Sequence, residues 1–398
     1  GVATALAAGG PGALFWMVLA AFFGMATKYA EGVLAIKYRT IDGNGHVLGG
    51  PFYYIENGMG VRWRWLAKIF AFFGAGVGLL GIGTFTQVNG ISSAVCNFFD
   101  PEKANTVSLF GGSYSIATVI AGLILTVCVG LVVIGGLKRI AQVSQVVVPF
   151  MAVLYFVFAL IIIVTHLGEI PAAALAIVKS AFSGSALAGG AMGTMMIAMQ
   201  KGIARGIFSN EAGLGSAPIA AAAAQTDSPV RQGLVSMTGT FIDTIVICTM
   251  TGLSIVVTGT WNTGLEGVAI TTAAFQKGLP FPPVVASVVL MVCLVFFAFT
   301  TILGWNYYGE RCIEYLFNRN RKVVKGYRWL YILAIFIGPY MTVQAVWNIA
   351  DIFNALMAFP NLIALVALSR VVFSETKNYF GKSDDEKGDI SPNVQAES

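Results

Sequence analysis

The sequence predicts an all-α polytopic membrane protein, because its composition is too apolar for a soluble domain and its uncharged stretches are long enough to cross a bilayer. Hydrophobic residues make up 57% of the 398 residues and charged residues only 11%, whereas about a quarter of an average soluble domain is charged. Four uncharged intervals, residues 69–99, 140–165, 244–265 and 278–309, each reach the roughly 20 residues that a spanning helix needs. They lack strand-like alternation, so we expect helices and not barrel strands.

Apolar blocks between polar segments predict the order of the spans. A helical stub at residues 1–8 precedes nine full spans, near residues 11–36, 66–98, 114–136, 140–165, 172–200, 231–258, 282–308, 329–347 and 349–373. Residues 1–373 therefore form one transmembrane domain, and the polar residues 374–398 predict a disordered cytoplasmic tail. The chain opens in mid-pattern without a methionine or a basic signal-peptide region, so we expect its first helix to begin before residue 1.

The cations alternate between the two sides of this arrangement. Of the 24 Lys and Arg residues, all except Lys103, Lys179 and Lys277 lie in alternate loops or in the tail. The positive-inside rule predicts that those loops and the C-terminus lie in the cytoplasm. We therefore expect a multi-pass protein of the plasma (inner) membrane. This topology accounts for the net charge of +5, so we expect no nucleic-acid partner.

The sequence contains none of the common motifs of catalytic sites. The two histidines, His46 and His166, lie in loops, and no zinc-protease, nucleophile-elbow or Walker motif occurs. The five cysteines have no paired spacing, which argues against a disulfide framework or a zinc site. The glycine-rich residues 202–218 follow a membrane helix and lack a lysine–hydroxyl pair, so they do not predict a phosphate loop.

Polar side chains inside apolar spans are candidates for function, because they are costly in hydrocarbon unless they face protein or water. Such residues occur in three spans: Thr84, Thr86, Gln87 and Asn89; Thr238, Thr240, Asp243 and Thr244; and Thr300, Thr301 and Trp305. Paired threonine hydroxyls can coordinate a small hard cation together with carbonyl oxygens. The alternative is that hydroxyls bond back to their own helix or join neighbouring helices.

A glycine cluster in span 172–200 predicts an interrupted helix. Gly184, Gly189, Gly190 and Gly193 each weaken a helix by about 1 kcal/mol relative to alanine. Helices broken at mid-membrane form the binding sites of many transporters, where free N–H and carbonyl groups face the substrate and the ion. Close helix packing is the competing explanation.

Charged residues at the predicted cytoplasmic ends suggest a gate. Arg205, Asn210 and Glu211 can form a network that closes the inner side. Lys28 and Glu31 are spaced i,i+3 and can pair on one helix face, although simple anchoring of Lys28 at the interface is the alternative.

Six stretches carry a resemblance to a known family: GVATALAAGGPGALFWM at 1–17, GMATKYAEGVLAIKYR at 24–39, GGPFYYIENG at 49–58, GIFSNEAGLGSAPIAAAAA at 206–224, FIDTIVICT at 241–249 and TTILGWNYYGER at 300–311. With these residues the chain resembles the alanine or glycine:cation symporters, a branch of the amino acid/polyamine/organocation transporters. The resemblance implies a leucine-transporter-type 5+5 inverted repeat, with repeats at residues 1–165 and 172–373 and a truncated first core helix. It also implies uptake of small neutral amino acids driven by sodium or protons, with sodium as the coupling ion and no cofactor.

The resemblance further implies roles for single residues. Sodium is expected at the Phe297 carbonyl and the hydroxyls of Thr300 and Thr301. The amino acid pocket is expected at Gln87, Met192, Gly193, Thr301 and Trp305. The alternatives are an uncoupled amino acid channel or exchanger, or an inactive fragment, because the family's glycine-rich break in the first core helix would precede Gly1.

Overall fold

A computed structural model describes the chain except for residues 42, 44–46, 110, 183–190 and 389–398. Seven helical segments of the described residues are long and apolar enough to cross a membrane: Gly12–Lys37, Val61–Phe99, Ile116–Ile134, Gly136–Thr165, Pro229–Val257, Pro283–Leu316 and Val343–Ala367. The prediction of an all-α polytopic membrane protein is therefore confirmed.

The α-helices are α1 (Val2–Gly9), α2 (Gly12–Lys37), α3 (Pro51–Tyr54), α4 (Arg64–Leu80), α5 (Phe85–Phe99), α6 (Ile116–Ile134), α7 (Gly136–Thr165), α8 (Ile170–Phe182), α9 (Ala191–Asn210), α10 (Ala217–Ala221), α11 (Pro229–Thr240), α12 (Thr249–Val257), α13 (Val268–Gly278), α14 (Pro283–Leu316), α15 (Arg321–Ile337), α16 (Val343–Ala367) and α17 (Ser369–Gly388). Short π- and 3-10 helices lie at Ile55–Met59, Val61–Trp63, Leu167–Glu169, Phe241–Cys248, Thr260–Asn262 and Gly338–Tyr340. Two antiparallel hairpins pair β1 (Thr40–Ile41) with β2 (Val47–Leu48) and β3 (Thr106–Leu109) with β4 (Gly112–Ser115).

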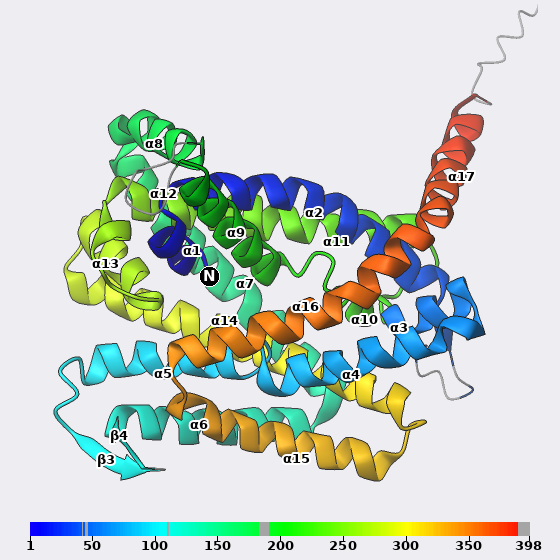
Figure 1. The fold of residues 1–398 in the computed structure, drawn as a ribbon, viewed down its shortest axis with the longest axis horizontal. Helices are drawn as coiled ribbons and strands as arrows, with labels where there is room; N and C mark the ends of the chain where they lie inside the picture. Colours follow the sequence, from blue (N-terminus) through cyan, green and yellow to red (C-terminus); the bar gives the residue numbers. More distant parts are fainter. Residues whose placement is uncertain (42, 44–46, 110, 183–190, 389–398) are drawn as a thin grey trace, which may run out of the picture.

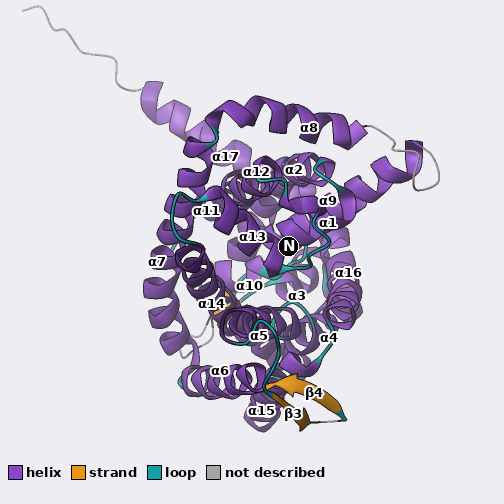
Figure 2. Cartoon of the chain, turned by 90° about the vertical axis from the view of Figure 1, so that its left-hand side faces the viewer, coloured by secondary structure: helices purple, strands orange, loops and turns teal. Residues whose placement is uncertain are grey.

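The long helices run roughly along the long axis of the molecule, and α2 lies beside both α9 and α11 (Figure 1). Helices α4, α14 and α16 pack together in a second group, with α6 and α15 outside them. The β3–β4 hairpin lies at one end of the long axis (Figure 1), and it appears beside α15 in the view along that axis (Figure 2). Trp305, Tyr331 and Phe70 are fully buried between these helices.

Small residues allow the close approach of α2 to α11. A Cβ atom at Gly32 would lie 2.7 Å from Ser236 Oγ and 2.9 Å from the Gly233 Cα atom. Lipid tails are as apolar as the helices, so membrane helices associate through such close van der Waals packing of small side chains. This contact holds the C-terminal half of α2 against α11.

Some predicted boundaries were wrong. The spans predicted at 329–347 and 349–373 are α15 and α16, which meet at the turn Gly338–Tyr340. Pro339 lacks an N–H group, and a helix therefore stops readily at this position. Hydropathy stays high across this turn, so the sequence alone did not show where α15 ends.

The predicted broken span corresponds to α8 and α9. Helix α8 ends at Phe182 and α9 begins at Ala191. Gly184, Gly189 and Gly190, which predicted the break, lie outside the described residues, whereas Gly193 lies in the first turn of α9.

Helix α17 extends into the region that was predicted as a disordered tail. Helix α17 continues to Gly388, where the composition predicted disorder. Its first half is attached to α2, because Lys37 Nζ donates to Glu375 at 2.7 Å and Tyr29 pairs with the Thr376 hydroxyl at 2.6 Å. Tertiary contacts with α2 thus support a helix that composition alone does not.

Candidate functional site

A polar network surrounds the loop between α9 and α10. Glu211 begins this loop, and its carboxylate accepts hydrogen bonds from Trp305 Nε1 at 3.0 Å and from Ser216 Oγ at 2.5 Å. Trp305 is only 1% exposed, so its hydrogen bond joins α14 to the loop in the interior. Two residues that the sequence analysis assigned to different sites, Trp305 to the pocket and Glu211 to the gate, are therefore direct partners.

The loop depends on left-handed backbone conformations. The φ angles of Glu211, Gly213 and Gly215 are 58°, 84° and 82°, which glycine adopts easily and other residues rarely. A Cβ atom at Gly215 would lie 2.6 Å from the ring of Phe70. At Gly215 a larger residue would therefore clash with Phe70. Glu211 adopts a sparsely populated conformation of the kind that occurs often at functional sites.

Glu31 of α2 lies on the other side of this loop. Its Oε1 atom accepts hydrogen bonds from the Gly215 amide at 3.1 Å and from Asn361 Nδ2 at 2.7 Å. The same Asn361 amide donates to the Gly213 carbonyl at 2.9 Å, and Tyr54 donates to Asn361 Oδ1. Four elements, α2, α3, the loop and α16, meet in this way.

Asn361 was missed by the sequence analysis, and Glu31 was considered only as a partner of Lys28. Asn361 is completely buried in an apolar helix. A lone amide in a membrane span is itself the signal that could have identified it, because such a group needs a buried partner.

Asn210 and Asp243 extend the network toward α11. Asn210 Nδ2 donates to Thr244 Oγ1 at 3.0 Å, and its Oδ1 atom accepts from the Ala212 amide at 2.9 Å. Asp243 Oδ2 accepts from the hydroxyls of Ser209 at 2.7 Å and Thr244 at 2.8 Å. Asp243 lies in the π-helix Phe241–Cys248, a rare element that is frequent at functional sites.

Arg205, the third predicted gate residue, has a different partner. Its guanidinium donates to both carboxylate oxygens of Asp351 on α16, at 3.0 and 2.7 Å, and its Cζ atom lies 4.1 Å from the centroid of the Trp347 ring. The Arg205 side chain is buried, while that of Asp351 is 46% exposed. The structure therefore joins Arg205 to α16, whereas Asn210 and Glu211 contact other elements.

The predicted sodium ligands cluster on one side of α14. The Thr300 hydroxyl donates to the Phe297 carbonyl at 3.0 Å, and the Thr301 hydroxyl donates to the same oxygen at 2.9 Å. Three oxygens thus lie close together, as a hard cation requires. The bonds within the helix also match the alternative in which threonine satisfies its own backbone.

The remaining predicted pocket residues lie on α5 and α9. Gln87 is buried, and its Nε2 atom donates to the Ile82 carbonyl at 3.1 Å, in the turn between α4 and α5. Met192 and Gly193 lie at the start of α9, and their side-chain environment is outside the described part of the structure.

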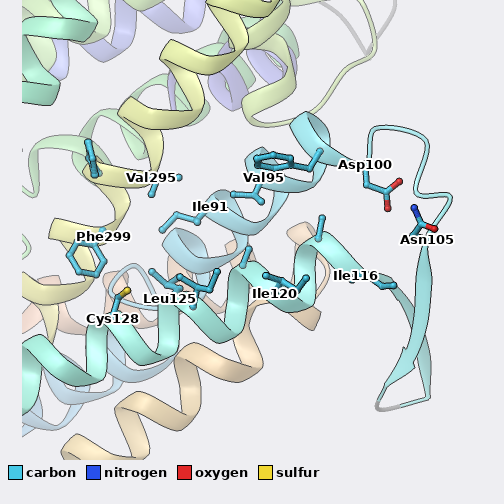
Figure 3. Close-up of a pocket in the computed structure, with 15 residues that line it drawn as sticks. Ile91, Val95, Asp100, Asn105, Ile116, Ile120, Leu125, Cys128, Val295 and Phe299 are labelled. Atoms are coloured by element: carbon cyan, nitrogen blue, oxygen red, sulfur yellow. The ribbon is translucent and has the colours of Figure 1, made fainter.

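A separate cavity of about 740 Å³ lies between α5, α6 and α14. Figure 3 shows that apolar side chains such as Ile91, Leu125 and Phe299 line it. At its mouth the Ser115 hydroxyl donates to Asp100 at 2.5 Å, and this hydrogen bond lowers the pKa of Asp100 below its usual value. Among the residues whose side chains are described, none of the predicted substrate, sodium or gate residues lines this cavity, so it is distinct from the polar network.

Comparison with known proteins identifies the family. The model of the sodium:alanine symporter family matches residues 1–394. An uncharacterised transporter of Haemophilus influenzae is 54% identical over 96% of this chain and 79% of its own length. The sodium/alanine symporter AgcS of Methanococcus maripaludis is 47% identical over 95% of this chain and 80% of its own length. A probable sodium/glutamine symporter, GlnT of Bacillus subtilis, is 40% identical over 95% of this chain and 74% of its own length. The protein is thus a transporter and not an enzyme, and the chain belongs to the sodium:alanine symporter family.

Proposed function

We propose that this sodium-coupled amino acid symporter takes up small neutral amino acids such as alanine or glycine by alternating access. The observation that carries the proposal is the polar network inside apolar helices, in which the α9–α10 loop contacts α2, α14 and α16 together. An interior network that joins several spans suits a transporter that must open on one side at a time. The name of the relative AgcS favours alanine, and that of GlnT marks glutamine as the competing substrate.

The coupling ion would bind at the Phe297 carbonyl and the hydroxyls of Thr300 and Thr301. Both hydroxyls lie within hydrogen-bonding distance of the Phe297 carbonyl oxygen. Sodium requires further oxygen ligands from other elements or from the substrate. Ion and substrate are coupled if both favour the same closed arrangement.

The amino acid would bind between Gln87 and Trp305, with Thr301, Met192 and Gly193 completing the pocket. The indole of Trp305 is buried beside Glu211, to which it donates a hydrogen bond. A pocket bounded by such a bulky buried ring favours small side chains, because added volume in a packed site is destabilising.

The inner gate would be formed by Arg205, Asn210 and Glu211. Each ties the end of α9 or the following loop to a different element: Arg205 to α16, Asn210 to Thr244 and Glu211 to α14. Rupture of these contacts would free the loop and open the inner side. We propose further that the gate and the C-terminus face the cytoplasm, and that residues 1–165 and 172–373 form two inverted repeats.

Uptake of radiolabelled alanine into proteoliposomes tests the function. The expected result is accumulation only with an inward sodium gradient, and competition by excess unlabelled glycine. Flux that ignores the sodium gradient would indicate an uncoupled channel or exchanger. Stronger competition by glutamine than by glycine would contradict the assignment of a small substrate.

A further inference from the structure

The polar network contains more negative than positive side chains. Lys28, which is 8% exposed, acts electrostatically on Glu31, Glu211 and Asp243. One ammonium group therefore interacts electrostatically with three carboxylates, and their full ionisation would leave two negative charges that Lys28 does not compensate. Arg205, another cation beside the network, is already paired with Asp351. Uncompensated charge in the interior is unfavourable by several kcal/mol per ion, so the network favours the binding of further cations.

The hydrogen bonds identify where such a cation would bind. Both oxygens of Glu211 accept hydrogen bonds, and Asp243 accepts two through Oδ2. Glu31 accepts two through Oε1, but its Oε2 atom is buried and has no hydrogen-bond donor among the described residues. Glu31 is itself only 1% exposed, and a buried carboxylate oxygen without a partner requires an explanation.

The surroundings of Glu31 are suited to a small cation. Asn361 and the Gly215 amide donate to the carboxylate and hold it in a single orientation. The Gly213 carbonyl and Tyr54 orient Asn361 in turn. Lys28 lies one helical turn before Glu31 on α2, and its positive charge opposes a cation bound at Glu31. The site thus combines a carboxylate oxygen that has no hydrogen-bond donor in the described part of the chain, Oε2 of Glu31, with a neighbouring ammonium group that favours release of the bound cation.

We infer that Glu31 binds one monovalent cation, H⁺ or Na⁺, at its Oε2 atom, in addition to the ion proposed at Thr300 and Thr301. This inference rests on the proposed function. A proton would add to a lone pair of Oε2 and leave to water; a sodium ion would be coordinated by the same oxygen. Because Glu31 holds α2 to the α9–α10 loop and to α16, the cation stabilises the arrangement in which these elements are together.

The variant Glu31→Gln tests the inference, since glutamine has nearly the same shape and is neutral without a cation. We expect gradient-driven alanine uptake to fall by about 5- to 150-fold, the usual range of coupling effects. Alanine exchange at equal concentrations on both sides, which needs no cation release, should persist. The matched control is Glu375→Gln, which removes a carboxylate of a surface ion pair with Lys37.

Two series of alanine uptake measurements distinguish the ions. At fixed sodium concentration, a wild-type dependence on pH that disappears in Glu31→Gln identifies a proton. At fixed pH, a sodium Hill coefficient that is lower by about one in the variant identifies sodium. Unchanged profiles in both series, with sodium-driven uptake intact, would overturn the inference and leave the proposed function standing.

The proposed function can fail separately, since wild-type protein without sodium-driven uptake would refute it whatever the variant does. If Glu31→Gln does not reach the membrane, Glu31→Asp keeps the charge and retracts the carboxylate by one methylene. The cation concentration for half-maximal alanine uptake by Glu31→Asp should differ from that of the wild type by about 5- to 150-fold. A dependence identical to that of the wild type would also overturn the role of Glu31.

Discussion

Replacement of Gly215 by alanine tests whether the α9–α10 loop depends on its glycine geometry. Gly215 has a φ angle of 82°, and a Cβ atom there would lie 2.6 Å from the Phe70 ring and 2.8 Å from Pro51 Cγ. Its amide also donates to Glu31. The substitution therefore affects both the backbone conformation and the packing at the centre of the polar network.

The magnitude follows from two independent terms. A residue with a Cβ atom in the left-handed conformation is destabilised by about 1–2 kcal/mol. Overpacking against a ring and a proline, neither of which can move far in a buried site, adds about 1–3 kcal/mol. We expect Gly215→Ala to lower the free energy of unfolding by about 2–5 kcal/mol in total.

Heat inactivation in detergent measures this effect as the fraction of monodisperse protein after incubation at increasing temperature. The matched control is Gly326→Ala in α15, because a Cβ at that helical position would meet no atom within 4 Å beyond the adjoining backbone of its own helix. Alanine also favours a helix by about 1 kcal/mol relative to glycine. The midpoint should fall for Gly215→Ala and stay or rise for Gly326→Ala. Equal midpoints would show that the loop relaxes freely and would refute the argument.

Three further predictions concern separate features. Thr301→Ala should raise the sodium concentration for half-maximal alanine uptake by about 5- to 150-fold with an unchanged midpoint of heat inactivation; an equal sodium requirement would remove Thr301 from the ion site. Glu211→Gln should slow alanine exchange while equilibrium binding of alanine persists, and unaltered flux with unaltered coupling would remove the gate. Asp100 has a lowered pKa, so its stabilising effect is complete above the unfolded value of about 3.9 and is lost as the pH falls through the lower folded value. Thermal stability of Asp100→Asn should therefore be below wild type at pH 7 and converge with it in acid; parallel curves would contradict this.

The membrane spans could be predicted because they depend on properties that add up along the chain. A bilayer accepts a helix when about 20 neighbouring residues are apolar, and this sum needs no knowledge of the fold. The resemblance of residues 206–224 to a transporter family is local in the same sense, and the family assignment agreed with it. Both conclusions follow from short stretches of sequence.

The partners of the site residues depend on packing between distant segments. Trp305 and Glu211 are separated by 94 positions and Asn361 and Glu31 by 330, so no local pattern links them. Likewise, averaged hydropathy could not show the turn after α15. Composition could not show that α17 packs on α2. The sequence by itself determined that the chain is a membrane transporter and which polar residues enter its spans. The tertiary structure alone decided which of them meet, because buried polar groups take their partners from whichever helices pack beside them.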